Sequence, residues 1–113
     1  MMNKTALADV LEYREDRFTK RVLHQGDQLV FVLNFLPGQE LPAHRHPGAE
    51  VSILVLEGEG QVVADDVAVE VGKGDALQLS GEENFLFRNT GDKPASLYVV
   101  LSHIPSPKYA QNI

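Results

Sequence analysis

Short apolar stretches separated by turn-forming residues dominate the chain from Phe18 onward. Each stretch spans eight residues or fewer, which is the length of a strand rather than of a helix. The pattern predicts strands over residues 29–36, 51–56, 61–64, 67–71, 76–79, 85–87 and 95–102. Between two of them, Asp65-Asp66 suits a tight hairpin turn. Several short strands with regular turn signals are typical of an all-β barrel or sandwich.

The two ends of the chain have a different pattern. Leu7, Val10 and Leu11 have helix-like spacing, which predicts a short N-terminal helix or an irregular arm. Pro105 and Pro107 end regular structure after the last strand. We therefore expect three parts, namely an arm or short helix over residues 1–19, one barrel domain over residues 20–104 and a tail over residues 105–113.

Composition narrows the possible functions. The chain has 113 residues, enough for one domain, and no cysteine, which excludes disulfides, thiolate metal sites and cysteine nucleophiles. The formal net charge is −6 and Lys20-Arg21 is the only adjacent basic pair, which argues against nucleic-acid binding. No apolar run is long enough to cross a bilayer, and the N-terminus lacks the apolar core of a secretory signal. We expect no membrane partner and a cytoplasmic location.

The candidate chemistry lies in the segment from His44 to Glu50. His44 and His46 point to the same face if this segment is extended, because strand side chains alternate, and Arg45 then points away. Glu50 follows four residues later and could join them. Two imidazoles and a carboxylate facing one interior form the ligand set of many divalent transition-metal sites. The alternative interpretation is a pair of surface histidines beside the turn at Pro47.

This constellation resembles the first motif of the cupins, small RmlC-like barrels of the double-stranded β-helix (jelly-roll) type. That motif reads glycine, five residues, His-x-His, three or four residues, glutamate, six residues, glycine. Gly38, His44, His46 and Glu50 match in order, but seven residues rather than six separate Glu50 from Gly58. A β-bulge would absorb the extra residue and leave Glu50 pointing inward, whereas without a bulge Glu50 would point outward as a solvated carboxylate.

The second cupin motif is present in frame but altered in content. It reads glycine, five residues, Pro-x-Gly, two residues, histidine, three residues, asparagine. When the first glycine of the motif is aligned with Gly74, its final asparagine falls on Asn89. In this alignment Ser80 and Glu82 replace the proline and glycine, and Phe85 replaces the histidine. A centre of three histidines and one glutamate therefore cannot be built from the matching positions. Phe85 is expected to be core packing or an apolar wall of a ligand cavity.

The resemblance implies an all-β cupin barrel that binds a small organic molecule. It also implies a site for one divalent transition metal (Mn, Fe, Ni, Cu or Zn) on His44, His46 and Glu50, held weakly or lost, and no organic cofactor. The alternative is a metal-dependent enzyme of the dioxygenase or isomerase type, for which no catalytic residue is assigned. A third interpretation is a structural partner protein with a vestigial site.

Two further expectations concern the other histidines and the oligomeric state. His24 and His103 could be recruited as ligands, although exposure or a backbone hydrogen bond is the usual fate of such residues. The resemblance also implies a homodimer, because small cupins commonly pair their barrels. Residues 22–36 supply apolar strand surface for such a contact.

Overall fold

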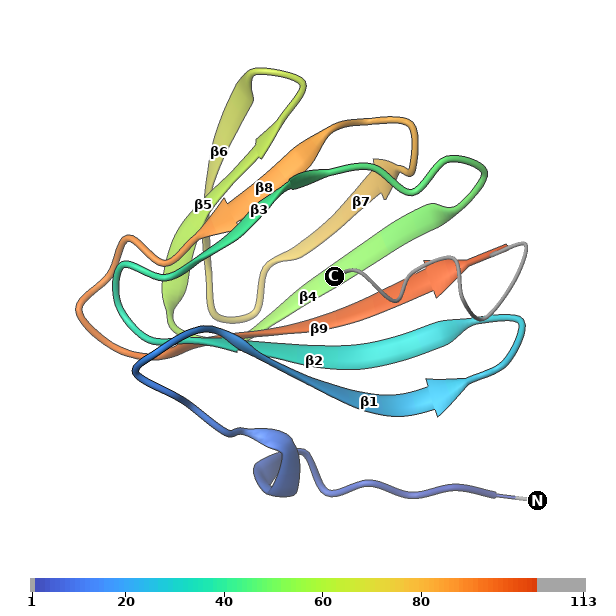
Figure 1. The fold of residues 1–113 in the computed structure, drawn as a ribbon, viewed down its shortest axis with the longest axis horizontal. Helices are drawn as coiled ribbons and strands as arrows, with labels where there is room; N and C mark the ends of the chain where they lie inside the picture. The colour runs from blue at the N-terminus through green and yellow to red at the C-terminus, as the bar shows by residue number, and fades with distance from the viewer. Residues whose placement is uncertain (1, 104–113) are drawn as a thin grey trace.

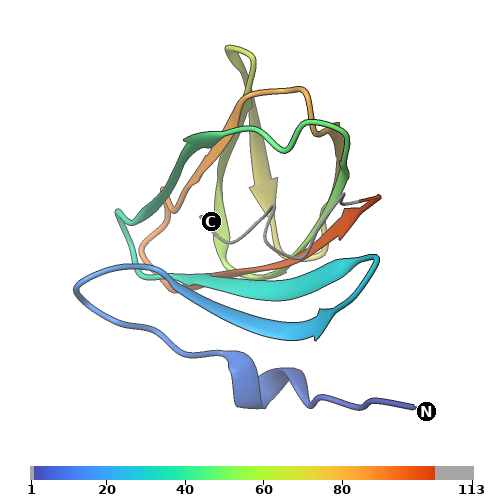
Figure 2. The ribbon, with the colours of Figure 1, turned by 45° about the vertical axis from the view of Figure 1, so that its right-hand side comes forward.

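Nine strands form two antiparallel sheets that enclose one interior in the computed structural model, which describes residues 2–103 (Figures 1 and 2). The five-stranded sheet has the order β1 (Thr19–Gln25), β2 (Leu29–Phe35), β9 (Ala95–Ser102), β4 (Glu50–Glu57), β7 (Ala76–Ser80). The four-stranded sheet has the order β3 (Glu40–His44), β8 (Phe85–Arg88), β5 (Glu59–Ala64), β6 (Val67–Gly72). The all-β prediction is confirmed. The tail expected over residues 105–113 lies outside the described residues.

Side chains from the inner faces of both sheets form the core. Strand β4 shows the alternation, since Val51, Ile53 and Val55 are buried while Leu54 between them is exposed. Three aromatic rings lie in series through the interior, Phe18 against Phe35 and Phe35 against Phe87, with centroids 5.3 and 4.8 Å apart. This apolar burial is the main term that holds the two sheets together.

The N-terminal arm crosses the outer face of the five-stranded sheet (Figure 1). It contains one turn of 3-10 helix, η1 (Leu7–Val10). The arm is anchored to the sheet by buried hydrogen bonds. Asn34 donates to the Val10 carbonyl at 2.8 Å, and the Ser96 hydroxyl lies 2.7 Å from the Asn34 side-chain oxygen and 2.6 Å from the Tyr13 hydroxyl. No helix within residues 2–103 is long and apolar enough to span a membrane.

The hairpin between β5 and β6 turns at Asp65-Asp66, as predicted. Ala64 and Val67 are paired across the turn, and both aspartates have positive φ, 46° and 70°. This is the conformation of a two-residue hairpin loop whose twist matches the strands. The Asp65 carboxylate accepts a hydrogen bond from the Asn84 backbone N–H at 2.9 Å, which ties the hairpin to the turn before β8.

Strand β3 is absent from the predicted strands. It is an edge strand paired only with β8, it contains Pro42, and four of its five side chains are not fully buried. Its register with β8 shifts between Leu41 and His44. Polar composition and a proline hide such a strand from periodicity, although both are normal at a sheet edge.

Candidate functional site

Strand β3 and the loop after it carry two histidines into the barrel. His44 is the last residue of β3 and is paired with Phe85 of β8, and His46 follows with only 3% of its surface exposed. The ring centroids of His44 and His46 are 4.8 Å apart and the rings are nearly perpendicular, at 82°. The two side chains therefore share one face of the barrel interior, as the His-x-His spacing predicted.

The turn between β7 and β8 holds the backbone of this loop. The His46 N–H donates to the Gly81 carbonyl at 2.8 Å, and the Gly81 N–H donates to the Ala49 carbonyl at 2.8 Å. A Cβ on Gly81 would lie 1.9 Å from the His46 carbonyl oxygen. Only glycine allows this approach, and sequence reasoning did not single out Gly81.

A backbone hydrogen bond sets the tautomer of His44. Its Nδ1 lies 2.7 Å from the Pro42 carbonyl oxygen, which can only accept, so Nδ1 carries the proton. Nε2 of His44 then bears a lone pair. That atom is buried and receives no hydrogen bond from any residue in the range 2–103. An imidazole that donates one N–H to a carbonyl and presents its other nitrogen is arranged like a metal-ligating histidine.

The interior keeps both rings neutral. Burial, the neighbouring His44 and the charge of Lys20 lower the pKa of His46 to about 4. Burial also lowers the pKa of His44, against the opposing effect of its bond to the Pro42 carbonyl. Neutral imidazole is the form that binds metal.

Phe85 lies beside the two histidines. It is 3% exposed, and its ring centroid is 4.5 Å from that of His44 and 6.3 Å from that of His46. The cavity at this point has a volume of about 10 Å³. Its walls are Phe31, Leu33, Leu41, His44, His46, Ile53, Phe85, Leu97 and Val99. This is space for about one water molecule or one metal ion, and an organic molecule would enter only if the walls moved.

Glu50 does not join the histidines, which corrects the expected set of three ligands. Its side chain is exposed, and its partners across the sheet are Ser80 and Ser102. Strand β4 does contain an irregularity, but it lies between Val55 and Glu57, near the strand's end. It therefore does not turn Glu50 inward. Within residues 2–103 no three histidine, aspartate or glutamate side chains are grouped to hold a metal ion.

Val51 occupies the inward position instead. It is fully buried, at 0% exposure. With the four-residue spacer that the cupin motif also allows, Val51 takes the place of the glutamate and the six residues 52–57 lead to Gly58. The sequence contains this signal, because six residues separate Val51 from Gly58, as the motif requires, whereas seven residues separate Glu50 from Gly58. Two ligand positions of the motif are thus apolar, at Val51 and Phe85.

The other candidate residues lie away from the cavity. Arg45 is exposed, as are His24 and His103. Arg88 is paired on the surface with Glu40, at 2.8 Å between Nε and Oε2. Asn89, the last residue of the second motif, is buried with a structural role. Its amide donates to the carbonyls of Phe35 at 3.1 Å and Lys93 at 2.9 Å.

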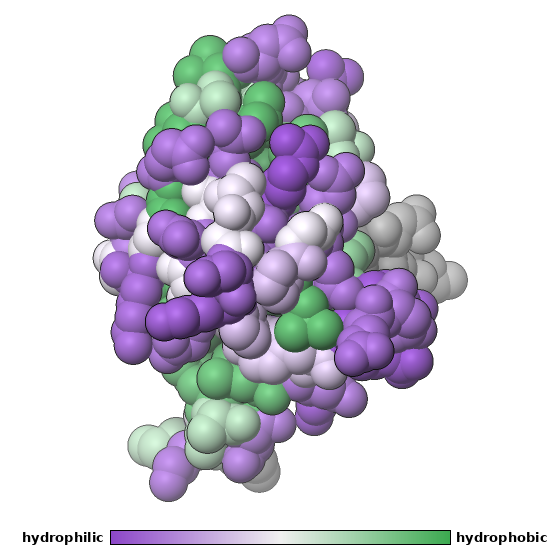
Figure 3. All heavy atoms as spheres, turned by 90° about the vertical axis from the view of Figure 1, so that its left-hand side faces the viewer, coloured by the Kyte–Doolittle hydropathy of each residue, from purple (hydrophilic) through white to green (hydrophobic). Residues whose placement is uncertain are grey.

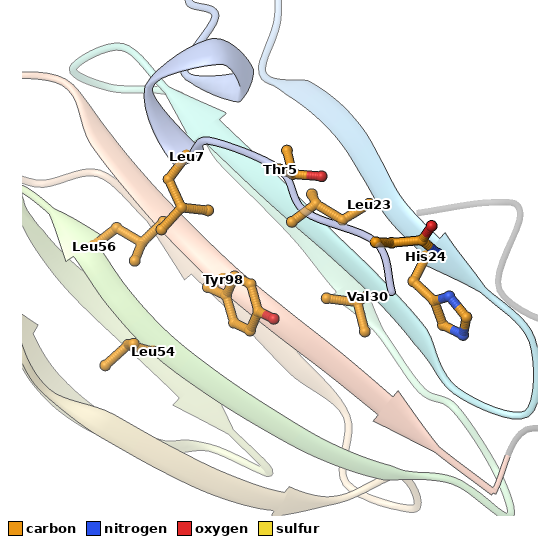
Figure 4. Close-up of a pocket in the computed structure, with 9 residues that line it drawn as sticks. Thr5, Leu7, Leu23, His24, Val30, Leu54, Leu56 and Tyr98 are labelled. Carbon is orange, nitrogen blue, oxygen red and sulfur yellow. The ribbon is translucent and has the colours of Figure 1, made fainter. Parts of the chain in front are cut away.

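A second hollow lies outside the barrel, between the arm and the five-stranded sheet (Figure 4). Its volume is about 520 Å³. It is lined by Asn3, Thr5, Leu7, Leu23, His24, Val30, Leu54, Leu56 and Tyr98. None of the residues that line this groove also lines the histidine cavity. Tyr98 of β9 therefore belongs to this outer face.

Comparisons with known proteins agree with this architecture. The family model described as "Cupin domain" matches residues 31–101. The structure of TT1209 from Thermus thermophilus is similar over 92% of this chain and 100% of that one, with 27% identity and a TM-score of 0.86. An RmlC-like cupin protein from Desulfovibrio desulfuricans matches over 88% and 96%, with 27% identity and a TM-score of 0.77.

A curated relative covers less of the chain. Protein SchB of Streptomyces halstedii is 36% identical over 61 residues, which are 54% of this chain and 44% of that protein. The match spans less than half the length of SchB.

Proposed function

Because this chain belongs to the cupin family, we propose that it binds one divalent transition metal through His44 and His46 and a small molecule at the positions that the metal leaves open. The observation that carries the proposal is the hydrogen bond from His44 Nδ1 to the Pro42 carbonyl, which aims a buried, unprotonated Nε2 into the cavity. A cavity of about 10 Å³ suits a single ion, and a small molecule would reach that ion only if the apolar walls moved.

Two imidazoles fit such an ion, but they are an incomplete set of ligands. Neutral imidazole suits Zn, Cu, Ni and Fe, and a firmly held ion ordinarily has three or four protein ligands. With Val51 and Phe85 buried at the two remaining positions, we expect weak and exchangeable binding. When bound, the metal would supply a Lewis acid with open coordination positions.

Binding is favoured over catalysis by the walls of the cavity. Apart from the two histidines, every side chain that lines it is an apolar one, and no carboxylate is among them. A general acid or base must reach a reacting atom within hydrogen-bond distance. The alternative of a dioxygenase or isomerase would have to rely on the metal and its two histidines alone.

The experiment is a titration of metal into chelator-treated, untagged protein. Co(II) is followed by its visible absorption, and Ni(II) and Zn(II) by calorimetry. We expect one site per chain, lost in His44→Ala/His46→Ala and kept in His24→Ala/His103→Ala, because the second pair lies outside the cavity. Azide added to the Co(II) protein should change the spectrum if coordination positions are open.

Two results would contradict the proposal. Stoichiometric metal retention by His44→Ala/His46→Ala would place the metal elsewhere. Absence of binding in the wild-type protein, at metal concentrations up to the millimolar range, would leave an apolar barrel with vestigial histidines.

A further inference from the structure

Lys20 brings a positive charge to the wall of the histidine cavity. It lies on the edge strand β1 opposite Leu33, a residue that lines the cavity, and its side chain is partly buried. The Lys20 Nζ lies 4.8 Å from the centroid of the Phe31 ring, which forms part of the same wall. An ammonium group over an aromatic face is attracted to the ring by a cation–π interaction. The lysine is therefore directed toward the barrel interior.

This position differs from that of the polar side chains on the outside of the barrel. Hydrophilic residues cover much of the face in Figure 3, where water surrounds them. The cavity walls, by contrast, are apolar apart from His44 and His46. Burial lowers the pKa of Lys20, and the charge of Lys20 contributes to the lowered pKa of His46. An ammonium group that has lost part of its water gains more from a nearby negative charge than a fully hydrated one does.

A metal ion on the two histidines would add to this positive charge. Both imidazoles are neutral in the folded protein, so they would not reduce the charge of a divalent ion. No residue within 2–103 that lines the cavity is acidic, because Glu50 is exposed and Val51 takes the inward position. Positive charge without a negative partner is costly in an apolar interior. The metal-loaded site therefore favours a ligand that carries negative charge.

We propose that the small molecule bound at this site is a monocarboxylate, whose carboxylate pairs with both the metal ion and the Lys20 ammonium group. This inference rests on the metal site proposed above and specifies the class of its ligand. The carboxylate would supply the negative charge and the oxygen ligand that the exposed Glu50 does not. The rest of the molecule would be apolar, because Leu33, Leu97 and Val99 offer it no hydrogen-bonding side chain.

Lys20 also marks where such a ligand would enter. The cavity holds about 10 Å³, and walls such as Phe31 and Leu33 are almost completely buried. Lys20 is partly exposed on an edge strand, and exposed side chains change rotamer on the nanosecond timescale. A rotation of the lysine side chain uncovers the Phe31 ring without breaking any hydrogen bond of the sheet. The ligand would then replace the ring as the partner of the ammonium group.

Lys20 has opposite effects on the two parts of the loaded site. Its charge repels the metal ion and attracts the carboxylate. The metal and the carboxylate attract each other, so each raises the affinity for the other by the same factor. Lys20→Met keeps an unbranched side chain and removes the charge, and it should therefore separate the two effects.

The test is Co(II) titration of chelator-treated, untagged protein in acetate and in acetamide at equal ionic strength. Acetamide has the shape of acetate without its charge. We expect acetate to raise the Co(II) affinity of the wild type about tenfold relative to acetamide. Lys20→Met should reduce this factor to about threefold or less, and should raise the affinity measured in acetamide about threefold, because the repulsion is removed. A loss of structure would instead lower both affinities.

Lys73→Met is the matched control. It removes the same charge from an exposed lysine that is paired with Glu57 on the surface, so both affinities should remain those of the wild type. Butyrate and sulfate test the class of ligand. Butyrate should act at lower concentration than acetate, because its chain buries apolar surface against the walls. A larger effect of sulfate than of either carboxylate would overturn the assignment of a carboxylate.

Two results would overturn this inference and leave the metal site in place. One is Co(II) binding with equal affinity in acetate and in acetamide. The other is an acetate effect that Lys20→Met leaves unchanged. Absence of Co(II) binding in both solutions would overturn the metal site itself, and this inference with it.

Discussion

At the scale of a single residue, Phe85 limits how many metal ligands the histidine cavity can provide. Its ring occupies the side of the cavity next to His44, at a centroid distance of 4.5 Å. We expect Phe85→His to add a third imidazole and raise metal affinity by about tenfold or more, since even changes around metal ligands shift affinity by that order. The measurement is Co(II) or Ni(II) titration of wild type and variant, beside thermal melts.

Phe87→His is the matched control for that substitution. Phe87 is fully buried on the same strand, but it packs against Phe35, at 4.8 Å between centroids, and does not line the cavity. There an imidazole would lack a partner and should lower stability by about 1–3 kcal/mol without any gain in metal affinity. If Phe85→His behaved in the same way as Phe87→His, the alignment of Phe85 with the missing ligand would be wrong.

The site could be read from the sequence only where side-chain direction follows from spacing alone. His44 and His46 are two residues apart, so any extended backbone sends them to one side. Glu50 was misplaced because its direction depends on where β4 absorbs one extra residue, and the irregularity lies beyond Val55. Local sequence does not locate a bulge within a run of Val, Leu and Ile, since each of these residues is compatible with either face.

Gly81 acts at the level of elements, because it joins the turn before β8 to the loop that carries His46. A Cβ there would collide with the carbonyl oxygens of His46 and Ala49, at 1.9 and 2.4 Å. We expect Gly81→Ala to lower stability by about 1–3 kcal/mol and to weaken metal binding, as the loop must move away. Gly72→Ala is the control, because its Cβ would have no neighbour nearer than 4.0 Å. Denaturant melts and Co(II) titration of both variants test this, and equal losses would contradict it.

The turn between β5 and β6 offers a substitution that should raise the stability of the fold rather than lower it. Asp66 has a φ of 70°, which glycine adopts without strain, and Asp-Gly is a preferred pair for this turn. Asp66→Gly should stabilise the fold by about 0.5–1 kcal/mol in denaturant melts. Asp65→Ala should do the reverse, because it removes the acceptor for the Asn84 N–H. A loss of stability in Asp66→Gly would mean that the aspartate makes a contribution other than turn geometry.

Strands with strong apolar alternation were predictable from the sequence. A strand that forms mainly because a neighbouring strand offers it hydrogen bonds was not. The hairpin of β5 and β6 follows from two apolar stretches around Asp65-Asp66. Strand β3 has only Leu41 fully buried and exists because β8 offers it hydrogen bonds. A single sequence does not display such pairing, since the partner lies more than forty residues away along the chain.

At the scale of the whole molecule, the barrel encloses two ionisable rings in a chain that has 43% hydrophobic residues and a net charge of −6. The charged groups remain at the surface, where ion pairs such as Lys73 with Glu57, at 3.3 Å, contribute little. The histidines are different, because the fold requires them to be neutral. The free energy of unfolding should therefore depend on pH through the two buried histidines.

The sign of that dependence follows from His46. Its pKa is about 4 in the folded protein against an ordinary value of 6.5, so between these values the unfolded chain binds a proton that the folded chain does not. Stability should be full above about pH 6.5 and should fall as the pH drops towards 4, by roughly 3 kcal/mol in total for this residue. The lowered pKa of His44 adds to the same trend.

Urea melts of chelator-treated protein between pH 4 and 8 measure this slope. His46→Gln removes the titrating group and should flatten the curve between pH 4 and 6.5, whereas His24→Gln, on the exposed end of β1, should leave it as in the wild type. A wild-type slope that His46→Gln does not change would mean that His46 is protonated at no cost to the fold. The ring would then be accessible to bulk water, and the closed, ion-sized cavity on which the metal proposal rests would be excluded by the same measurement.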